Sequence, residues 1–178
     1  MQQASYTLSS ITALLMLTMS MTASPGQAQP AAPLPAPPQG TPEAALVKVM
    51  GQMIYVPVYS HIYYYNTRRR YLLAVTLSIR NTDLHKPLTI TSVRYYDTDG
   101  KLLQEYLEKP LHLGPLASTD VFVEEHDVRG GAGANFLVEW RAETPVNAPL
   151  VEAVMVGTSG TQGLAFMSPG RVINPHPQ

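Results

Sequence analysis

The sequence contains no cysteine among its 178 residues. This absence excludes disulfides, iron–sulfur clusters, thiolate zinc sites and cysteine nucleophiles. An exported protein can fold without disulfides, so the absence does not argue against a place outside the cytoplasm. A domain of more than about 100 residues can bury enough apolar surface to fold without such cross-links.

Charge is also scarce, because Asp, Glu, Lys and Arg make up 14% of the chain, well below the usual fraction of about a quarter. The net charge is -1, with 12 basic and 13 acidic residues. This balance argues against binding to nucleic acid, which requires a clustered positive surface. Ser, Thr, Asn, Gln and Tyr must supply much of the wet surface, which suits a β-sheet protein outside the cytoplasm.

Lys and Arg are missing from the first ten residues, yet the next segment is typical of a secretory signal. Residues 11–21 (ITALLMLTMSM) are uncharged and apolar. They are too few to cross a bilayer, but their number suits the apolar region of a signal peptide. The small residues Gly26 and Ala28 predict cleavage after Ala28, which assigns residues 1–28 to the signal.

We therefore expect an exported protein, either periplasmic or secreted. The alternative for residues 1–28 is an uncleaved membrane anchor, and we expect contact with a membrane only through this segment. Residues 29–42 follow and are rich in proline, alanine and glutamine. They have too few large apolar groups to fold, and we expect a disordered, semi-rigid tether.

A folded domain is predicted over residues 43–173, with a short tail at residues 174–178. Its first residues combine a capping residue, a proline and an acid in the order Thr41, Pro42 and Glu43. Apolar residues follow at helical spacing as far as Met50. This pattern predicts a short helix at the start of the domain.

The rest of the domain shows the two-residue periodicity of β-strands. Residues 71–80 form the clearest case, because their apolar side chains share one face: Leu73, Val75, Leu77 and Ile79. A second set alternates in the same way: Phe136, Val138 and Trp140. We expect these two sets to meet between two stacked sheets.

Four departures from simple alternation carry further predictions. Pro57 cannot donate to a strand ladder, so residues 53–59 should form an edge strand. The apolar residues change parity around Ser92, which predicts a β-bulge there. Residues 97–100 (DTDG) predict a tight turn. Residues 150–156 are apolar on both parities, so this strand should be central or covered on both faces.

Seven or eight short strands separated by turn signals, without a long helical pattern, indicate an all-β fold. We predict an Ig-like antiparallel β-sandwich, with a small β-barrel as the alternative.

Tyrosines and arginines gather in the first third of the domain. Tyrosine offers a flat ring and a hydroxyl, which suit sugars and protein partners. Adjacent arginines suit phosphate, a lipid headgroup or an acidic glycan. The alternative is a solvated loop and an edge that resists aggregation. The candidate binding residues are Tyr59, His61, Tyr63, Tyr65, Arg68, Arg69 and Arg70.

One local cluster places carboxylates around a histidine, and its candidate metal ligands are Glu124, His126 and Asp127. Carboxylates and imidazole can ligate divalent ions, which would support a metal-dependent or hydrolytic enzyme. However, adjacent strand residues point to opposite faces, and the sequence shows no second such cluster. We therefore expect no cofactor.

Five segments of the domain together resemble a known family: residues 55–63 (YVPVYSHIY), 77–83 (LSIRNTD), 90–103 (ITSVRYYDTDGKLL), 113–118 (LGPLAS) and 133–140 (GANFLVEW). They resemble an exported bacterial family known as the domain of unknown function numbered 3124. The resemblance covers residues 51–173 and implies a location in the bacterial envelope and a shared compact fold. It implies no activity.

The leading hypothesis is a non-catalytic exported binding module. Its surface would comprise Tyr63, Tyr64, Tyr65 and the three arginines, and its partner would be an unidentified envelope protein or glycan. An edge strand could also take up a partner strand. The alternatives are the metal-dependent or hydrolytic enzyme and a purely structural envelope protein.

Overall fold

The computed structural model of the chain describes residues 48–158 and 163–175. The strands belong to one compact unit, Glu43–Gln178. The predicted signal peptide and tether lie outside the described residues. Within those residues the chain forms twelve β-strands and one 3₁₀ turn, Gly131–Gly133, and it has no helix long and apolar enough to cross a membrane.

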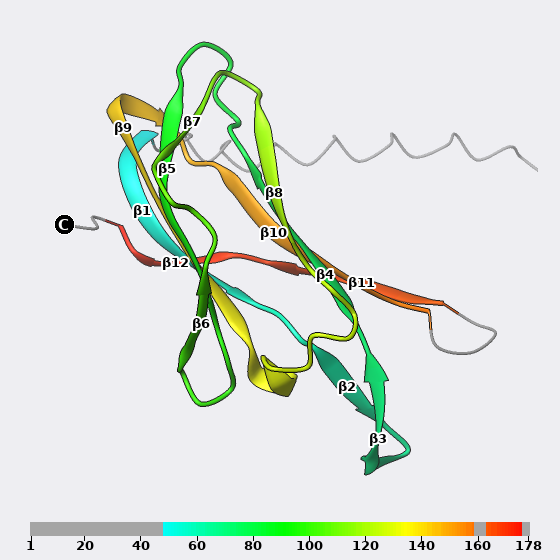
Figure 1. Cartoon of the computed structure of the whole chain (residues 1–178). Coiled ribbons are helices and arrows are strands. Elements are labelled where there is room, and N and C mark those ends of the chain that lie inside the picture. Colours follow the sequence, from blue (N-terminus) through cyan, green and yellow to red (C-terminus); the bar gives the residue numbers. More distant parts are fainter. Residues whose placement is uncertain (1–47, 159–162, 176–178) are drawn as a thin grey trace, which may run out of the picture. The chain divides into compact units, whose positions relative to one another are not determined.

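Six strands form one antiparallel sheet in the order β12–β1–β9–β5–β6, with β7 also paired to β5 (Figure 1). These strands are β1 (Lys48–Pro57), β5 (Leu88–Tyr96), β6 (Leu102–Glu105), β7 (Leu111–Leu113), β9 (Asn135–Asn147) and β12 (Arg171–Asn174).

Four further strands form a second antiparallel sheet in the order β11–β10–β4–β8. They are β4 (Ala74–Arg80), β8 (Ser118–Val123), β10 (Leu150–Gly157) and β11 (Leu164–Pro169). The remaining strands, β2 (His61–Tyr64) and β3 (Asn66–Leu72), pair with each other as a separate hairpin. Because both larger sheets are open at their edges, the fold is the predicted β-sandwich and not a barrel.

The core lies between the two sheets and contains both predicted apolar sets. Their members have no exposed surface: Leu73, Val75, Leu77, Ile79, Phe136, Val138 and Trp140. Burying one such side chain contributes about 1.5–3 kcal/mol relative to leaving it in water. The prediction that residues 73–79 and 136–140 share one core is therefore confirmed.

Two local predictions are also confirmed. The register between β5 and β9 shifts between Ile90 and Ser92, which is the predicted bulge. At the turn before β6, the backbone N–H of Gly100 donates to the carbonyl of Asp97 at 3.1 Å. Gly100 has a φ of 79°, a conformation that costs glycine little.

The predicted helix is wrong where the structure can test it. Residues 41–47 lie outside the described residues, but Lys48 and Val49 already belong to β1. They pair with Asn147 and Val146 of β9. Long-range pairing therefore overrides a local apolar spacing that also fits a helix.

The edge-strand prediction is also wrong, because β1 lies between β9 and β12. The pairing with β12 extends only from Met53 to Tyr55. Pro57 is the last residue of β1, beyond that pairing, so its missing N–H breaks no bond to β12. A proline is tolerated at the end of an interior strand for this reason.

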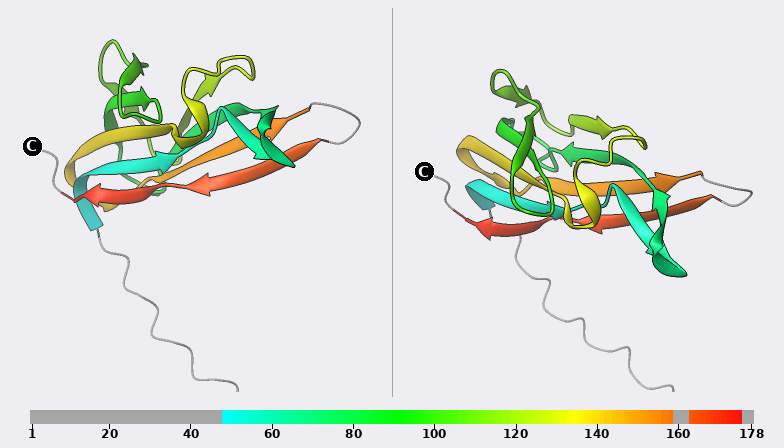
Figure 2. Two further views of the ribbon diagram at one scale, coloured as in Figure 1. Left: turned by 90° about the horizontal axis from the view of Figure 1, so that it is seen from below. Right: turned by 60° about the horizontal axis from the view of Figure 1, so that its bottom comes forward.

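The structure has more strands than the seven or eight predicted, partly because residues 163–172, which fit one last strand in the sequence, contain β11 and the start of β12. β11 and β12 follow each other along one side of the domain, and the chain passes from one sheet to the other at Gly170 (Figure 2). A Cβ at Gly170 would lie 2.6 Å from Cγ2 of Ile54 and 2.8 Å from the carbonyl oxygen of Val151. This crossing therefore requires glycine.

Asn81 and Asp83 join the loops at the end of the sandwich opposite hairpin β2–β3 (Figure 1). The Asn81 amide donates to three backbone carbonyls, those of Lys86, Leu113 and Gly114. The Asp83 carboxylate accepts backbone N–H groups of His85, Asn147 and Lys86, and these bonds lower its pKa to about 2. The two side chains connect β4 to loops of the six-stranded sheet.

Candidate functional site

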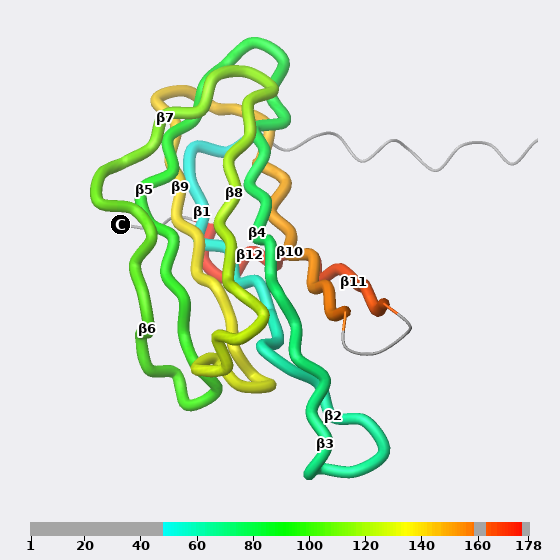
Figure 3. The backbone as a smooth tube through the Cα atoms, turned by 45° about the vertical axis from the view of Figure 1, so that its right-hand side comes forward, coloured from blue at the N-terminus to red at the C-terminus, as the bar shows by residue number. Residues whose placement is uncertain are grey.

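Hairpin β2–β3 carries most of the predicted binding residues and projects past the end of both sheets (Figures 1 and 3). Its base is anchored, because Val58 before β2 and Leu73 after β3 are fully buried in the core. The backbone N–H of Leu73 also donates to the carbonyl of Ser60 at 3.0 Å. The hairpin is thus a projection held by core residues on both sides.

The tip of the hairpin presents three tyrosines to solvent. Tyr63 and Tyr64 are each 47% exposed, and Tyr65 is 92% exposed. Tyr65 has a φ of 65°, which non-glycine residues rarely adopt because the Cβ crowds the backbone. The carboxamide oxygen of Asn66 accepts the backbone N–H of Arg68 at 3.0 Å. The tip is therefore a defined turn that holds a tyrosine in water.

Arg68, Arg69 and Arg70 all lie on β3 and are exposed, so they belong to a strand and not to a loop. Arg70 is opposite Tyr63 in the register of the hairpin. The guanidinium carbon of Arg69 lies 5.7 Å from the centre of the Tyr65 ring, within cation–π range. The structure therefore interleaves the predicted aromatic and basic residues on one hairpin.

The charge of the hairpin is of one sign. The sequence has no Asp or Glu between Glu43 and Asp83, so no carboxylate on the hairpin neutralises the three arginines. Guanidinium groups stay protonated and bind carboxylates or phosphates through paired N–H donors. The hairpin is consequently a positive surface with aromatic faces.

His61 differs from its neighbours, because it is only 4% exposed. Its ring meets that of Tyr63 edge to face, with 5.1 Å between centroids. Neither ring nitrogen has a hydrogen-bond partner among the residues that the structure describes. Burial, and then the charge of Arg70, lower the pKa of His61 below its ordinary 6.5. His61 therefore supports the base of the hairpin as a neutral ring.

This burial predicts a pH-dependent stability. Because the pKa of His61 is lower in the folded domain, the unfolded chain binds a proton there first as the pH falls below 6.5. The free energy of unfolding therefore decreases toward acid. His61→Phe cannot titrate and should remove this component. Urea unfolding at neutral and mildly acidic pH should show the stability advantage of the variant growing toward acid. An equal difference at both pH values would contradict the assignment.

Tyr59, the remaining candidate, lies outside the hairpin. It is half-buried, and its ring centre lies 6.0 Å from that of Phe166 on β11. The candidate binding residues therefore fall into a buried or half-buried group and an exposed group. Tyr59 and His61 pack at the base, whereas the exposed members form the surface: Tyr63, Tyr65, Arg68, Arg69 and Arg70.

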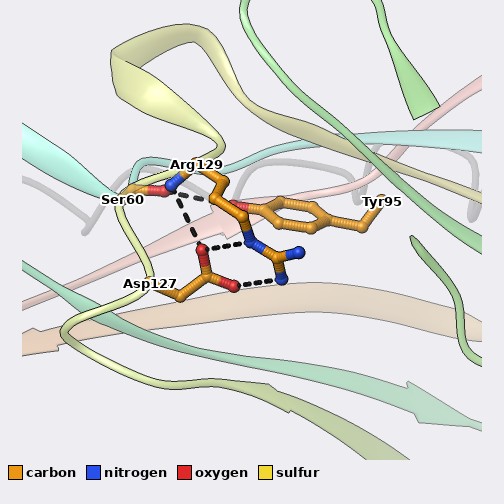
Figure 4. A network of polar contacts seen from close by, with 4 residues as sticks. All are labelled: Ser60, Tyr95, Asp127 and Arg129. Carbon is orange, nitrogen blue, oxygen red and sulfur yellow. Dashed lines mark hydrogen bonds and ion pairs between the residues drawn. The ribbon is translucent and has the colours of Figure 1, made fainter. Parts of the chain in front are cut away.

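The predicted metal ligands follow β8 on a loop, and Figure 4 shows one of them, Asp127, beside Arg129. Glu124 and His126 are exposed. The Asp127 carboxylate accepts Nε of Arg129 at 2.9 Å and Nη2 at 2.7 Å, which lowers the pKa of Asp127. Within residues 48–158 and 163–175, no group of three or more His, Asp or Glu is placed to hold a metal ion. The arrangement gives the metal hypothesis no geometric support.

Beside that loop, the hydroxyl of the buried Tyr95 lies 3.1 Å from Oγ of Ser60, just before β2 (Figure 4). Burial raises the pKa of Tyr95. A Cβ on the adjacent Gly130 would clash with the Tyr95 hydroxyl and lie 2.8 Å from Oγ of Ser60. The close contact of Ser60, Tyr95 and Gly130 therefore stabilises the base of the hairpin.

A second surface was not among the predicted sites. The outer face of the four-stranded sheet holds a hollow of about 430 Å³. It is lined by Thr76, Ser78, Arg80, Ser118, Thr119, Asp120, Glu152 and Val154. In the sequence analysis, this face was indicated only by residues 150–156, which are apolar on both parities. β10 is central as predicted, but Leu150, Val154 and Val156 are exposed on this outer face.

Comparisons with known proteins concern the family and fold. A family model described as "Protein of unknown function (DUF3124)" matches residues 51–173. A search of curated proteins finds no significant match. A solved structure, "Crystal Structure of Thermotoga maritima 1070", is 11% identical, with a TM-score of 0.40; the match covers 72% of this chain and 98% of that chain. The family match includes the hairpin and both sheets.

Proposed function

The chain belongs to the DUF3124 family, and from the geometry of its hairpin we propose that it is a non-catalytic binding module exported to the cell envelope. The binding surface is the exposed part of hairpin β2–β3, and the partner is an envelope protein or glycan. The single observation that carries the proposal is the exposure of three tyrosines and three arginines on a hairpin whose own residues include no carboxylate.

The chemistry of these groups favours binding over catalysis. Tyrosine rings provide flat apolar area at a low cost in side-chain entropy. Arginines add directional donors for anionic groups, but a guanidinium has no lone pair with which to act as a base. The uncharged apolar residues 11–21 and the small residues before the expected cleavage point support export.

Tyr63→Ala combined with Tyr65→Ala should weaken capture of the envelope partner by at least about 10-fold, since each exposed ring can contribute more than about 1 kcal/mol at an interface. The measurement is quantitative pull-down from envelope extracts, followed by titration of the captured component.

The matched control is Tyr63→Phe combined with Tyr65→Phe, which keeps both rings and removes only the hydroxyls. This control should retain most of the binding if ring faces make the contact. Unchanged capture by the alanine variant would refute the proposal, provided that its circular dichroism matches that of the wild type.

A further inference from the structure

The outer face of the four-stranded sheet exposes apolar side chains to water. One row of directly opposite residues crosses the four strands; in order, it comprises Phe122, Thr76, Val154 and Met167. Phe122 is 55% exposed, Met167 58% and Val154 36%, and the neighbouring Val156 is 41% exposed. Antiparallel sheets normally place polar residues on a face turned to water. Apolar side chains gathered on an exposed face, here with Thr76 between Phe122 and Val154, favour an interaction surface.

An acidic row lies beside the apolar row. Asp120 is opposite Ser78, and Ser78 is opposite Glu152, so both carboxylates lie at the hollow on this face. Arg80 lies in the next row, where its Nε donates to Oγ of Ser78 at 3.0 Å. The hollow therefore has two carboxylates against one guanidinium. We name this surface, with its apolar and acidic rows, the outer patch.

Hairpin β2–β3 has the complementary composition. Its tyrosine rings match the apolar row, and its arginines match Asp120 and Glu152. β3 leads through Leu73 directly into β4, so the hairpin extends beyond the end of the sheet whose outer face carries the patch (Figures 1 and 3). A hairpin presented in this way is available to the patch of another molecule.

We infer that two copies of this chain associate about a two-fold axis, each laying hairpin β2–β3 on the outer patch of the other. A two-fold axis repeats every contact, so both patches are covered and the assembly closes as a dimer. The inference rests on the proposed function, because it uses the same hairpin surface, and it names the partner as a second copy.

Charge reversal tests this arrangement in the purified full chain by sedimentation velocity. One variant reverses the hairpin, with Arg68→Glu, Arg69→Glu and Arg70→Glu, and the other reverses the patch, with Asp120→Lys and Glu152→Lys. In each variant alone, like charges meet at both contacts, and the dimer dissociation constant should rise by at least about 100-fold. Wild-type dimerisation should also weaken as salt increases.

An equal mixture of the two variants should restore the dimer, because each hairpin then meets a patch of opposite charge. Glu108→Lys combined with Glu143→Lys is the matched control; it reverses two exposed carboxylates outside the patch and should leave dimerisation unchanged. Circular dichroism of each variant establishes that it is folded.

Three outcomes would overturn the inference: a wild-type chain that stays monomeric at all concentrations, reversed variants that still dimerise, or a mixture that fails to associate. None of these outcomes by itself contradicts the proposed function. A monomeric wild type that captures an envelope glycan or protein through Tyr63 and Tyr65 would keep the binding module and reject the dimer.

Discussion

Trp140→Ala should lower the free energy of unfolding by about 3–5 kcal/mol, the usual cost of removing a large ring from a packed core. Trp140 is fully buried in the six-stranded sheet, within the core that it shares with β4. Within residues 48–158 and 163–175, its indole N–H has no hydrogen-bond partner. The ring therefore stabilises the fold through its area and packing, while its polar group opposes that gain.

Trp140→Phe separates these two contributions. Phenylalanine keeps an aromatic ring in the core and removes the unpaired N–H, so the loss should be only about 1 kcal/mol. Chemical unfolding should be followed by circular dichroism, because Trp140 is the single tryptophan and both variants lose its fluorescence. Equal losses for the two variants would show that the indole N–H is satisfied and contributes to stability.

Asn81→Ala should lower the free energy of unfolding by about 2–4 kcal/mol. Asn81 is 2% exposed, and its amide nitrogen lies 2.9, 3.3 and 2.8 Å from the carbonyl oxygens of Lys86, Leu113 and Gly114. Its own oxygen accepts the backbone N–H of Asp83 at 2.9 Å. Alanine would remove these four bonds; the carbonyl of Gly114 would keep the backbone N–H of Ala117 at 3.1 Å, and each buried backbone group that loses its partner costs free energy of desolvation.

Thr82→Ala provides the matched control on the same loop. The Thr82 hydroxyl donates a single bond of 2.8 Å to the carbonyl of Ala148, so its loss should cost only about 1 kcal/mol. Urea unfolding of both variants gives the comparison. If Asn81→Ala costs no more than Thr82→Ala, the three-carbonyl contact does not hold this end of the sandwich.

The Asn81 contacts also account for part of the sequence that carries the family resemblance. The segment LSIRNTD, residues 77–83, ends in Asn81 and Asp83. Its first half alternates core residues on β4, and its last residues connect the loops at the end of the sandwich. The end of this segment therefore has a structural role, because its side chains form hydrogen bonds to backbone groups of the loops.

The predicted binding residues show how far sequence reasoning reached at the site. The adjacency of Tyr63, Tyr65 and Arg68 in the chain was enough to group them as one candidate surface, whereas the projecting hairpin that carries them was seen only in the structure. The burial of His61 and the packing of Tyr59 on Phe166 were not predictable, since they depend on contacts with distant strands. The outer patch depends on three strand registers and was missed for the same reason.

Four features were predictable from the residues alone: the β class, the facing apolar sets of residues 73–79 and 136–140, the bulge at Ser92 and the turn at Gly100. Each follows from the local periodicity of apolar residues or from a local backbone preference. Three outcomes depended on tertiary contacts: Lys48 lies in a strand, Pro57 ends an interior strand, and Phe122, Val154 and Met167 share an exposed face. Those outcomes follow from pairing between strands far apart in the chain, which local periodicity does not encode.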